Sequence, residues 1–325
     1  MDQRPPPGIP RRRLLALAAS IGAALPVSVS IAGCSGPGPS VPDLLPPSDP
    51  EPTEVPPPTP TPEPPFVVAE GEERRLLMAG TRYETPLYVF GTGRLGPIAL
   101  ALGGVHGNEP GGWLAAERIV SRLRPDTGAL LVIPRANRVA TEVFERTTPE
   151  IGDLNRAYPG DPNGTPAQQI AHQIVETIRE FRVGLVVDMH ESWAFYKDRP
   201  QNGTAFLGQT IGTNGERASE ISRAVVEAVN RRILYPHEEF FFRDRFGSNQ
   251  AAAPGVPETT TQLDASGAPR GPGGASRSSL GLSTYVPGVI AVLVEMGQQQ
   301  SLERRIALHV EVLTEFLRQV GALGT

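Results

Sequence analysis

The chain has 325 residues, a formal net charge of -5 and a sequence pI near 5.7. We do not expect a nucleic-acid partner, because binding to a phosphate backbone requires a basic surface. Cys34 is the only cysteine, so the chain can form neither an internal disulfide nor a cysteine-based zinc site. Any metal site must therefore use histidine, aspartate and glutamate.

Residues 1–33 have the features of a signal peptide. Arginines precede the apolar stretch LLALAASIGAALPVSVSIAG, and IAGC at 31–34 is typical of a bacterial lipobox, whose cysteine receives a lipid. We therefore expect export, cleavage before Cys34, and attachment to the bacterial cell membrane through a lipid on Cys34. An uncleaved signal anchor is the alternative.

Residues 34–65 are rich in proline, most clearly in PPPTPTPEPP, and lack the apolar side chains needed for a core. This segment is predicted to be an extended, disordered spacer. Residues 66–325 then form the predicted catalytic domain, and their length suits a single α/β domain.

Four short apolar runs in this domain are predicted to be strands buried on both faces: 97–102, 129–133, 184–188 and 289–294. Two amphipathic helices are predicted around the apolar sets Ile170, Ile174, Ile178, Phe181 and Ile306, Val310, Leu313, Leu317, Val320. The second helix should begin after Ser301 and end before Gly321. Strands alternating with helices predict a three-layer α/β/α sandwich with a mixed, mainly parallel central sheet. Residues 247–280 are predicted to be a long loop.

The stretch GTGRLG at 91–96 fits the GxGxxG pattern of dinucleotide-binding loops. Such a loop must open a helix, whereas here a predicted strand follows. We therefore expect a turn between neighbouring strands rather than a cofactor loop.

Metal-binding residue types follow two of the predicted strands. GGVHGNEPGG at 103–112 places His106 and Glu109 on a glycine-rich strand-to-helix loop, and DMHES places His190 just beyond the strand that ends at Asp188. Sites in open α/β sheets form at the carboxyl ends of strands. A His₂Glu set with one open position is a zinc site of the catalytic kind. For either histidine alone, the alternative is a hydrogen-bonded residue of a polar loop.

The segment GDLNRAYPG at 152–160 gathers an acid, an amide and an arginine. Arg156 with Asn155 could clamp a substrate carboxylate, because the guanidinium fork matches two carboxylate oxygens. Asp153 could accept the spare N–H of a ligand histidine and fix its orientation. Asp188 should point the same way as His190 on an extended strand and support the site. The alternative for 152–160 is a capped turn with a surface arginine.

Four motifs, taken in chain order, resemble those of the zinc carboxypeptidase superfamily, in particular of its succinylglutamate desuccinylase and aspartoacylase branch. They are HGNE, DLNR, DMH and VEMG. The resemblance covers about residues 75–320. It implies a carboxypeptidase-like α/β/α fold that binds one zinc ion per chain. It places the zinc ligands at His106, Glu109 and His190, the substrate-carboxylate contacts at Asn155 and Arg156, and the supporting aspartate at Asp153.

The resemblance also places a catalytic glutamate at Glu295, directly after the predicted strand 289–294, where a general base would stand beside the other strand ends. An arginine that stabilises the oxyanion precedes DLNR in this superfamily. Arg146 is the candidate, with Arg135 and Arg138 as alternatives. The implied reaction is hydrolysis of an amide bond near a carboxylate, with Glu295 taking the proton of a zinc-activated water.

Three functions are compatible with these residues. The first is an exported N-acyl amino acid deacylase, and the second is a metallocarboxypeptidase acting on peptides or cell-wall peptides. Only one helix is predicted after Glu295, whereas desuccinylases generally append a β-domain, so we expect an open pocket that suits peptides. The third is a membrane-tethered lipoprotein that binds zinc or a carboxylate without turnover. No GxSxG motif supports a serine hydrolase. His172, His237 and His309 are given no role and are expected on helix surfaces or in a strand-like segment.

Overall fold

The computed structural model describes residues 65–198, 203–244 and 276–324. The chain divides into two units, Met1–Thr61 and Pro62–Thr325, and the described residues all belong to the second. The predicted signal peptide, Cys34, the spacer up to residue 64 and most of the predicted loop 247–280 lie outside the described residues. Among the helices described, none is long and apolar enough to cross a membrane.

An eight-stranded sheet in the order β1-β2-β4-β3-β5-β8-β6-β7 lies at the centre of the described structure. The strands are β1 Gly71–Leu77, β2 Thr85–Gly91, β3 Ile98–Gly103, β4 Ala129–Ile133, β5 Leu185–Ser192, β6 Thr210–Thr213, β7 Phe241–Asp244 and β8 Ile290–Gly297. The four central strands β4, β3, β5 and β8 run parallel. Antiparallel pairs join β2 to β4 and β6 to β8, so the sheet is mixed and mainly parallel, as predicted.

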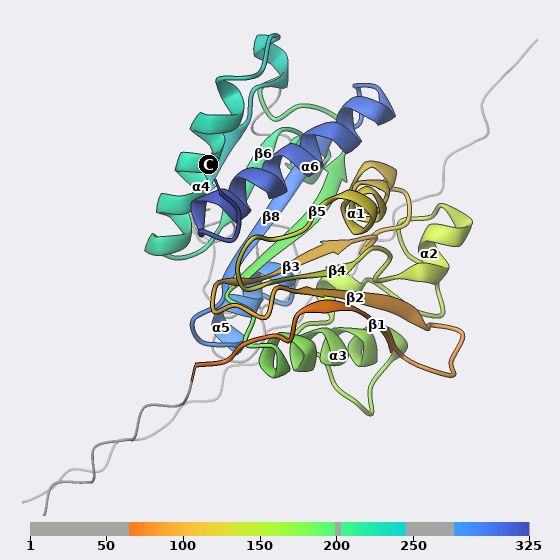
Figure 1. Ribbon diagram of the computed structural model, residues 1–325. Helices are drawn as coiled ribbons and strands as arrows, with labels where there is room; N and C mark the ends of the chain where they lie inside the picture. The colour runs from red at the N-terminus through yellow and green to blue at the C-terminus, as the bar shows by residue number, and fades with distance from the viewer. Residues whose placement is uncertain (1–64, 199–202, 245–275, 325) are drawn as a thin grey trace, which may run out of the picture. The chain divides into compact units, whose positions relative to one another are not determined.

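Helices cover both faces of this sheet (Figure 1). Their bounds are α1 Pro110–Arg122, α2 Arg138–Val143, α3 Pro166–Glu180, α4 Glu216–Asn230, α5 Leu282–Tyr285 and α6 Leu302–Gln319. Apolar residues of α1, α4 and α6 form one core against the sheet, and those of α3 and α5 belong to a second core. The arrangement confirms the predicted three-layer α/β/α sandwich.

The four predicted apolar strands correspond to β3, β4, β5 and β8, and every residue of these strands is buried. Two of them are longer than predicted. β5 continues to Ser192 and β8 to Gly297, so His190 and Glu295 lie inside strands rather than beyond them. The polar residues do not end the strands, because the backbone pairing of β5 with β8 continues through both positions.

The prediction of a turn between neighbouring strands at 91–96 was wrong. This stretch connects β2 to β3, but β4 lies between them in the sheet. β2 pairs antiparallel with β4, and the pairing of strands distant in sequence cannot be seen from a local turn pattern. Both predicted helices are present as α3 and α6, and Ser301 Oγ caps α6 by accepting a hydrogen bond from the Arg304 amide.

Candidate metal and catalytic site

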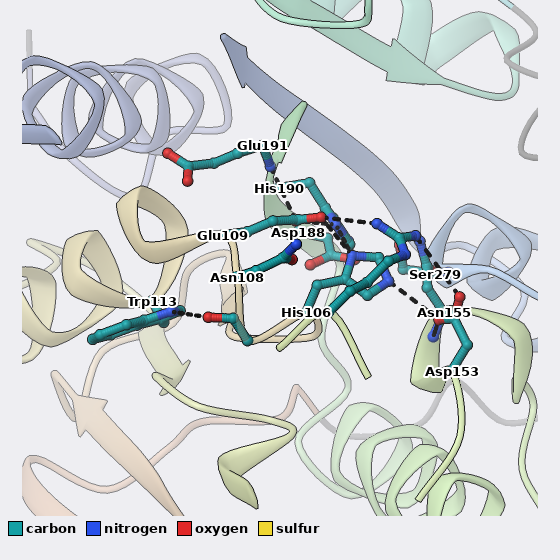
Figure 2. A network of polar contacts seen from close by, with 12 residues as sticks. His106, Asn108, Glu109, Trp113, Asp153, Asn155, Asp188, His190, Glu191 and Ser279 are labelled. Carbon is teal, nitrogen blue, oxygen red and sulfur yellow. Dashed lines mark hydrogen bonds and ion pairs between the residues drawn. The ribbon is translucent and has the colours of Figure 1, made fainter. Parts of the chain in front are cut away.

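The loop from Gly104 to Glu109 connects β3 to α1 and lies close to neighbouring backbone. Gly104 has a φ of 67°, a conformation that favours glycine. A side chain on Gly107 would overlap the Ala140 carbonyl, so only glycine fits there. The Trp113 indole N–H of α1 donates to the Gly107 carbonyl at 3.2 Å (Figure 2). The bare backbone thus allows a tightly packed loop that fixes the direction of its polar side chains.

Three buried side chains converge at the end of this loop. His106 Nδ1 lies 2.8 Å from Glu109 Oε1, and His190 Nδ1 lies 2.9 Å from Glu109 Oε2. The two Nδ1 atoms are 3.1 Å apart, and one ligand atom from each residue lies within 4.8 Å of the others. Figure 2 shows the two rings and the carboxylate turned toward one another. Two imidazoles and one carboxylate in this arrangement could hold a metal ion.

The outer ring nitrogens of both histidines are held by carboxylates. Asp153 Oδ1 lies 3.1 Å from His106 Nε2, and Asp188 Oδ2 lies 2.8 Å from His190 Nε2. Such contacts fix ring orientation and leave the other nitrogen for a metal, a pattern typical of metal-binding histidines. Asp153 is itself fixed, because its Oδ1 accepts a hydrogen bond from the Asn155 amide at 2.9 Å.

The charges in this group are strongly coupled. Burial disfavours the charged ring of His190, but Asp188 and Glu109 outweigh burial and raise its pKa well above the usual value. Burial also opposes ionisation of Glu109, yet the two histidines hold its pKa well below the usual value. The carboxylates therefore stabilise positive charge between the two rings. A divalent cation bound there would supply that positive charge as well.

Glu295 lies beside this group on the next strand. The register of β5 and β8 pairs His190 with Glu295, so both side chains project from the same face of the sheet. Glu295 is buried, and its Oε2 has no hydrogen-bond partner among the described residues. Burial raises the pKa of Glu295 to about 8, with a further contribution from Glu109 that His190 opposes. A carboxyl group with a raised pKa in a cavity is suited to general acid–base chemistry.

Of the three candidate arginines, the structure brings only Arg146 to this group. Its NH1 lies 3.1 Å from Glu109 Oε1, and its side chain is about half exposed to the cavity and solvent. Arg135 and Arg138 instead form ion pairs of 2.6 and 3.0 Å with glutamates of α1 and α2. Arg146 is therefore the arginine that can reach a substrate bound beside Glu109.

The predicted carboxylate clamp lies on a short 3₁₀ helix, Leu154–Arg156. Asn155 is buried, and its Oδ1 accepts a hydrogen bond from the Ser279 amide at 2.9 Å. Arg156 NH1 donates to the Asn155 carbonyl at 2.8 Å. Both residues line the same cavity of about 530 Å³ as the histidines and Glu295. Ser279 could not be identified from the sequence, because it contributes a backbone amide rather than its side chain.

A buried ion pair behind the site was not predicted. Glu191 donates its backbone N–H to Glu109 Oε2 at 3.0 Å, while its side chain points away from the histidines (Figure 2). Glu191 Oε2 pairs with Arg305 NH1 of α6 at 2.6 Å, and both residues are buried. Alternation along β5 could have placed Glu191 on the opposite face from His190. Nothing local in the sequence identified Arg305 as its partner.

His309 of α6 is buried, at 1% exposure, and not on a helix surface as expected. Burial lowers its pKa to about 3, and the nearby charge of His190 adds to this effect. The amphipathic pattern of α6 misled the prediction, because the buried face of this helix carries polar residues, Arg305 and His309 among them.

Part of the chain is similar to a known family. Residues 96–196 match the family described as the succinylglutamate desuccinylase/aspartoacylase catalytic domain, which confirms the resemblance carried by the motifs. The matched segment contains the three candidate metal ligands, Arg146, Asn155 and Arg156. Glu295 lies outside it and is brought to the site by the β5–β8 pairing.

Individual proteins are similar to parts of the chain. An N-alpha-acetyl-L-2,4-diaminobutyric acid deacetylase of Halomonas elongata is 37% identical over 98 residues, which are 29% of this chain and 28% of that protein. The fold is similar to that of the cell shape determinant protein Csd4 of Helicobacter pylori, with a TM-score of 0.55, 19% identity, and coverage of 70% of this chain and 51% of that one. A succinylglutamate desuccinylase/aspartoacylase of Rhodobacter sphaeroides gives a TM-score of 0.51 at 22% identity, covering 79% and 67% of the two chains. The chain thus matches about a quarter of its curated relative and half of Csd4.

The ion pair behind the site predicts a large effect of Arg305→Met on stability. Removing the guanidinium leaves the Glu191 carboxylate buried and unpaired, which should lower the free energy of unfolding by about 3 to 5 kcal/mol in urea denaturation. Arg118→Met is the matched control, because Arg118 pairs at 2.7 Å with Glu303, whose side chain is exposed to solvent. We expect the control to lose much less stability, because solvent screens an exposed ion pair. Equal losses would contradict the view that Glu191 depends on Arg305.

The burial of His309 predicts a pH dependence of stability. Its pKa lies below the ordinary value of 6.5, so the unfolded chain takes up this proton first as the pH falls. The contribution of neutral His309 to the free energy of unfolding is therefore complete above about pH 6.5. Below that value the free energy of unfolding should fall by about 1.4 kcal/mol per pH unit at its steepest. His309→Leu should flatten the dependence between about pH 6.5 and 4 in urea titrations, and His237→Leu, at an exposed histidine, should not. Equal slopes in the two variants would refute the assignment.

Proposed function

We propose that this protein is an exported, zinc-dependent hydrolase that cleaves an amide bond close to a carboxylate group of its substrate. The observation that carries the proposal is the convergence of His106, Glu109 and His190 beside Glu295 in one cavity. The match of residues 96–196 to a family named for deacylating enzymes supports the same reaction class.

His106, Glu109 and His190 would hold the zinc ion. Their inward-facing ring nitrogens and carboxylate form a His₂Glu donor set, and the carboxylates of Asp153 and Asp188 orient both rings from behind. A bound zinc ion would act as a Lewis acid that makes an attacking water more acidic and polarises the substrate carbonyl.

The remaining steps belong to side chains of the chain itself. Glu295 accepts the proton of the attacking water and returns it to the leaving amine, a role for which its position and raised pKa are suited. Arg146 faces the same cavity and would stabilise negative charge that develops on the carbonyl oxygen. Arg156, with Asn155, would bind the substrate carboxylate and so place the amide between Glu295 and Arg146.

Two substrate types share this arrangement of amide and carboxylate. The Halomonas relative is named as a deacetylase of an acetylated amino acid. Structures of Csd4 are named as tripeptide-bound and as those of a D,L-carboxypeptidase. We therefore propose N-acyl amino acids as substrates, with the C-terminal bond of peptides, including cell-wall peptides, as the second possibility. A lipoprotein that only binds zinc or a carboxylate would have no use for Glu295.

We further propose that the mature protein is lipid-anchored at the bacterial cell membrane through Cys34. The support is the sequence alone: an arginine-rich start, an apolar stretch, and IAGC at 31–34. The proline-rich residues that follow would then hold the hydrolase away from the membrane surface.

The catalytic assignment predicts separable effects of two substitutions in the full-length protein. Glu295→Gln should keep stoichiometric zinc in chelator-competition titrations but lose at least about 100-fold in kcat on N-acyl amino acids, because the general base is gone. His190→Asn should lose zinc and activity together, and His237→Asn should change neither. Wild-type turnover that survives complete zinc removal would refute the metal-dependent mechanism.

The lipid assignment predicts a change of location for Cys34→Ser. Expressed in a bacterium that processes lipoproteins, the wild-type protein should fractionate with membranes and carry the mass of attached lipid. Cys34→Ser should lose that mass, whereas Ser35→Ala should behave as the wild type. An unlipidated wild-type protein that retains residues 1–33 in the membrane fraction would instead establish the uncleaved signal anchor.

A further inference from the structure

Three leucines form an apolar surface inside the candidate active site. Leu207, Leu280 and Leu293 are buried and make a cluster separate from the two cores that flank the sheet. All three line the cavity that contains the histidines and Glu295. We call these residues the leucine wall. Their side chains therefore pack against one another and can also contact a ligand bound in the cavity.

Contacts of neighbouring residues place the leucine wall relative to the reacting groups. Leu280 directly follows Ser279, whose amide holds the Asn155 side chain of the carboxylate clamp at 2.9 Å. Leu293 precedes Glu295 by two residues on β8 and so projects from the same face of the sheet. The wall thus extends from the carboxylate clamp to the general base.

The third leucine extends the wall past the histidines. The Leu207 amide donates to Ser192 Oγ at 2.9 Å, and Ser192 follows His190 by two residues on β5. Arg146 and Asp153, by contrast, form ion pairs with Glu109 and His106.

Small uncharged residues line the same cavity as the leucines. They are Ala205, Ser276 and Ser278, and the two serine hydroxyls lie 2.7 Å apart and bond to each other. An ammonium or carboxylate group placed against the three leucine side chains would lose hydration that these side chains cannot replace, whereas an apolar group would be favoured there.

We propose that the leucine wall binds the side chain of the carboxylate-bearing half of the substrate, and that this side chain is apolar and about the size of leucine or methionine. The inference rests on the proposed function, because it assumes a carboxylate held by Asn155 and Arg156 and an amide beside Glu295. It goes beyond that function by defining the amino acid that hydrolysis releases. The family match over residues 96–196 includes none of the three leucines, so it does not bear on this choice.

The proposal is tested with the zinc-loaded full-length protein and matched substrates. N-acetyl-leucine and N-acetyl-methionine are compared with N-acetyl-asparagine, N-acetyl-aspartate and N-acetyl-2,4-diaminobutyrate, and glycyl dipeptides of the same amino acids cover the peptidase alternative. We expect kcat/KM for leucine to exceed that for the near-isosteric asparagine and aspartate by at least about tenfold, the scale of discrimination in an apolar pocket. Preference for any of the charged or amide side chains would overturn the inference and leave the hydrolase intact.

Two leucines of the same short segment provide a variant and its control. Leu280→Ala should reduce the ratio of kcat/KM for leucine over asparagine by about tenfold, because it removes part of the wall. Leu282→Ala removes an equally buried leucine that belongs to the core under the sheet and does not line the cavity. The ratio of kcat/KM for leucine over asparagine should be unchanged in Leu282→Ala, even if this variant is less stable. A ratio unaffected by Leu280→Ala would count against the wall as the side-chain site.

Product binding separates failure of this inference from failure of the proposed function. Calorimetry with zinc-loaded Glu295→Gln measures the affinity for free leucine, asparagine and aspartate without turnover. Tighter binding of leucine supports the leucine wall even if no substrate of the panel is hydrolysed, a result that would refute only the hydrolase. Tighter binding of aspartate or asparagine would overturn the inference whatever the activity.

Discussion

The pairing of β5 with β8 is the constraint on which the candidate site depends, because it places His190 opposite Glu295 on one face of the sheet. The same alternation puts Asp188 behind the His190 ring and Leu293 beneath Glu295. A shift of the register by one residue would move each side chain of one strand to the other face and separate Glu295 from His190. Backbone hydrogen bonds of two fully buried strands therefore set the geometry that the chemistry requires.

Both faces of β5 contribute to this geometry. On one face His190 meets His106 and Glu109, and on the other Glu191 pairs with Arg305 of α6. The link between the faces is short, since the Glu191 amide bonds to the Glu109 carboxylate. Glu109 also ends the loop that precedes α1. The helix layer is thus connected to the metal-binding group through two hydrogen-bonded contacts rather than through apolar packing alone.

Sequence reasoning identified the side chains of the site better than it identified the strands and contacts that hold them in place. His106, Glu109, His190 and the segment around Asn155 could be found because short motifs mark strand ends. β1, β6 and β7 were not predicted, because they are short or, in β1, mostly exposed and charged. The contacts of Ser279 and Arg305 join residues more than 100 positions apart, and such pairings depend on the tertiary fold.

The residues of the site come from different parts of the chain, and this affects how related proteins can change their substrates. The candidate metal ligands, Arg146, Asn155 and Arg156 lie within residues 96–196, whereas Glu295 and the leucine wall come from later segments. Substitutions of the three leucines could alter the cavity while Glu295 and the earlier polar residues are kept. Two homologues that keep the first part and Glu295 could therefore share one reaction and accept different substrates. Similarity confined to residues 96–196 includes neither Glu295 nor the leucines, so the later segments have to be compared before a reaction or a substrate is transferred from one homologue to another.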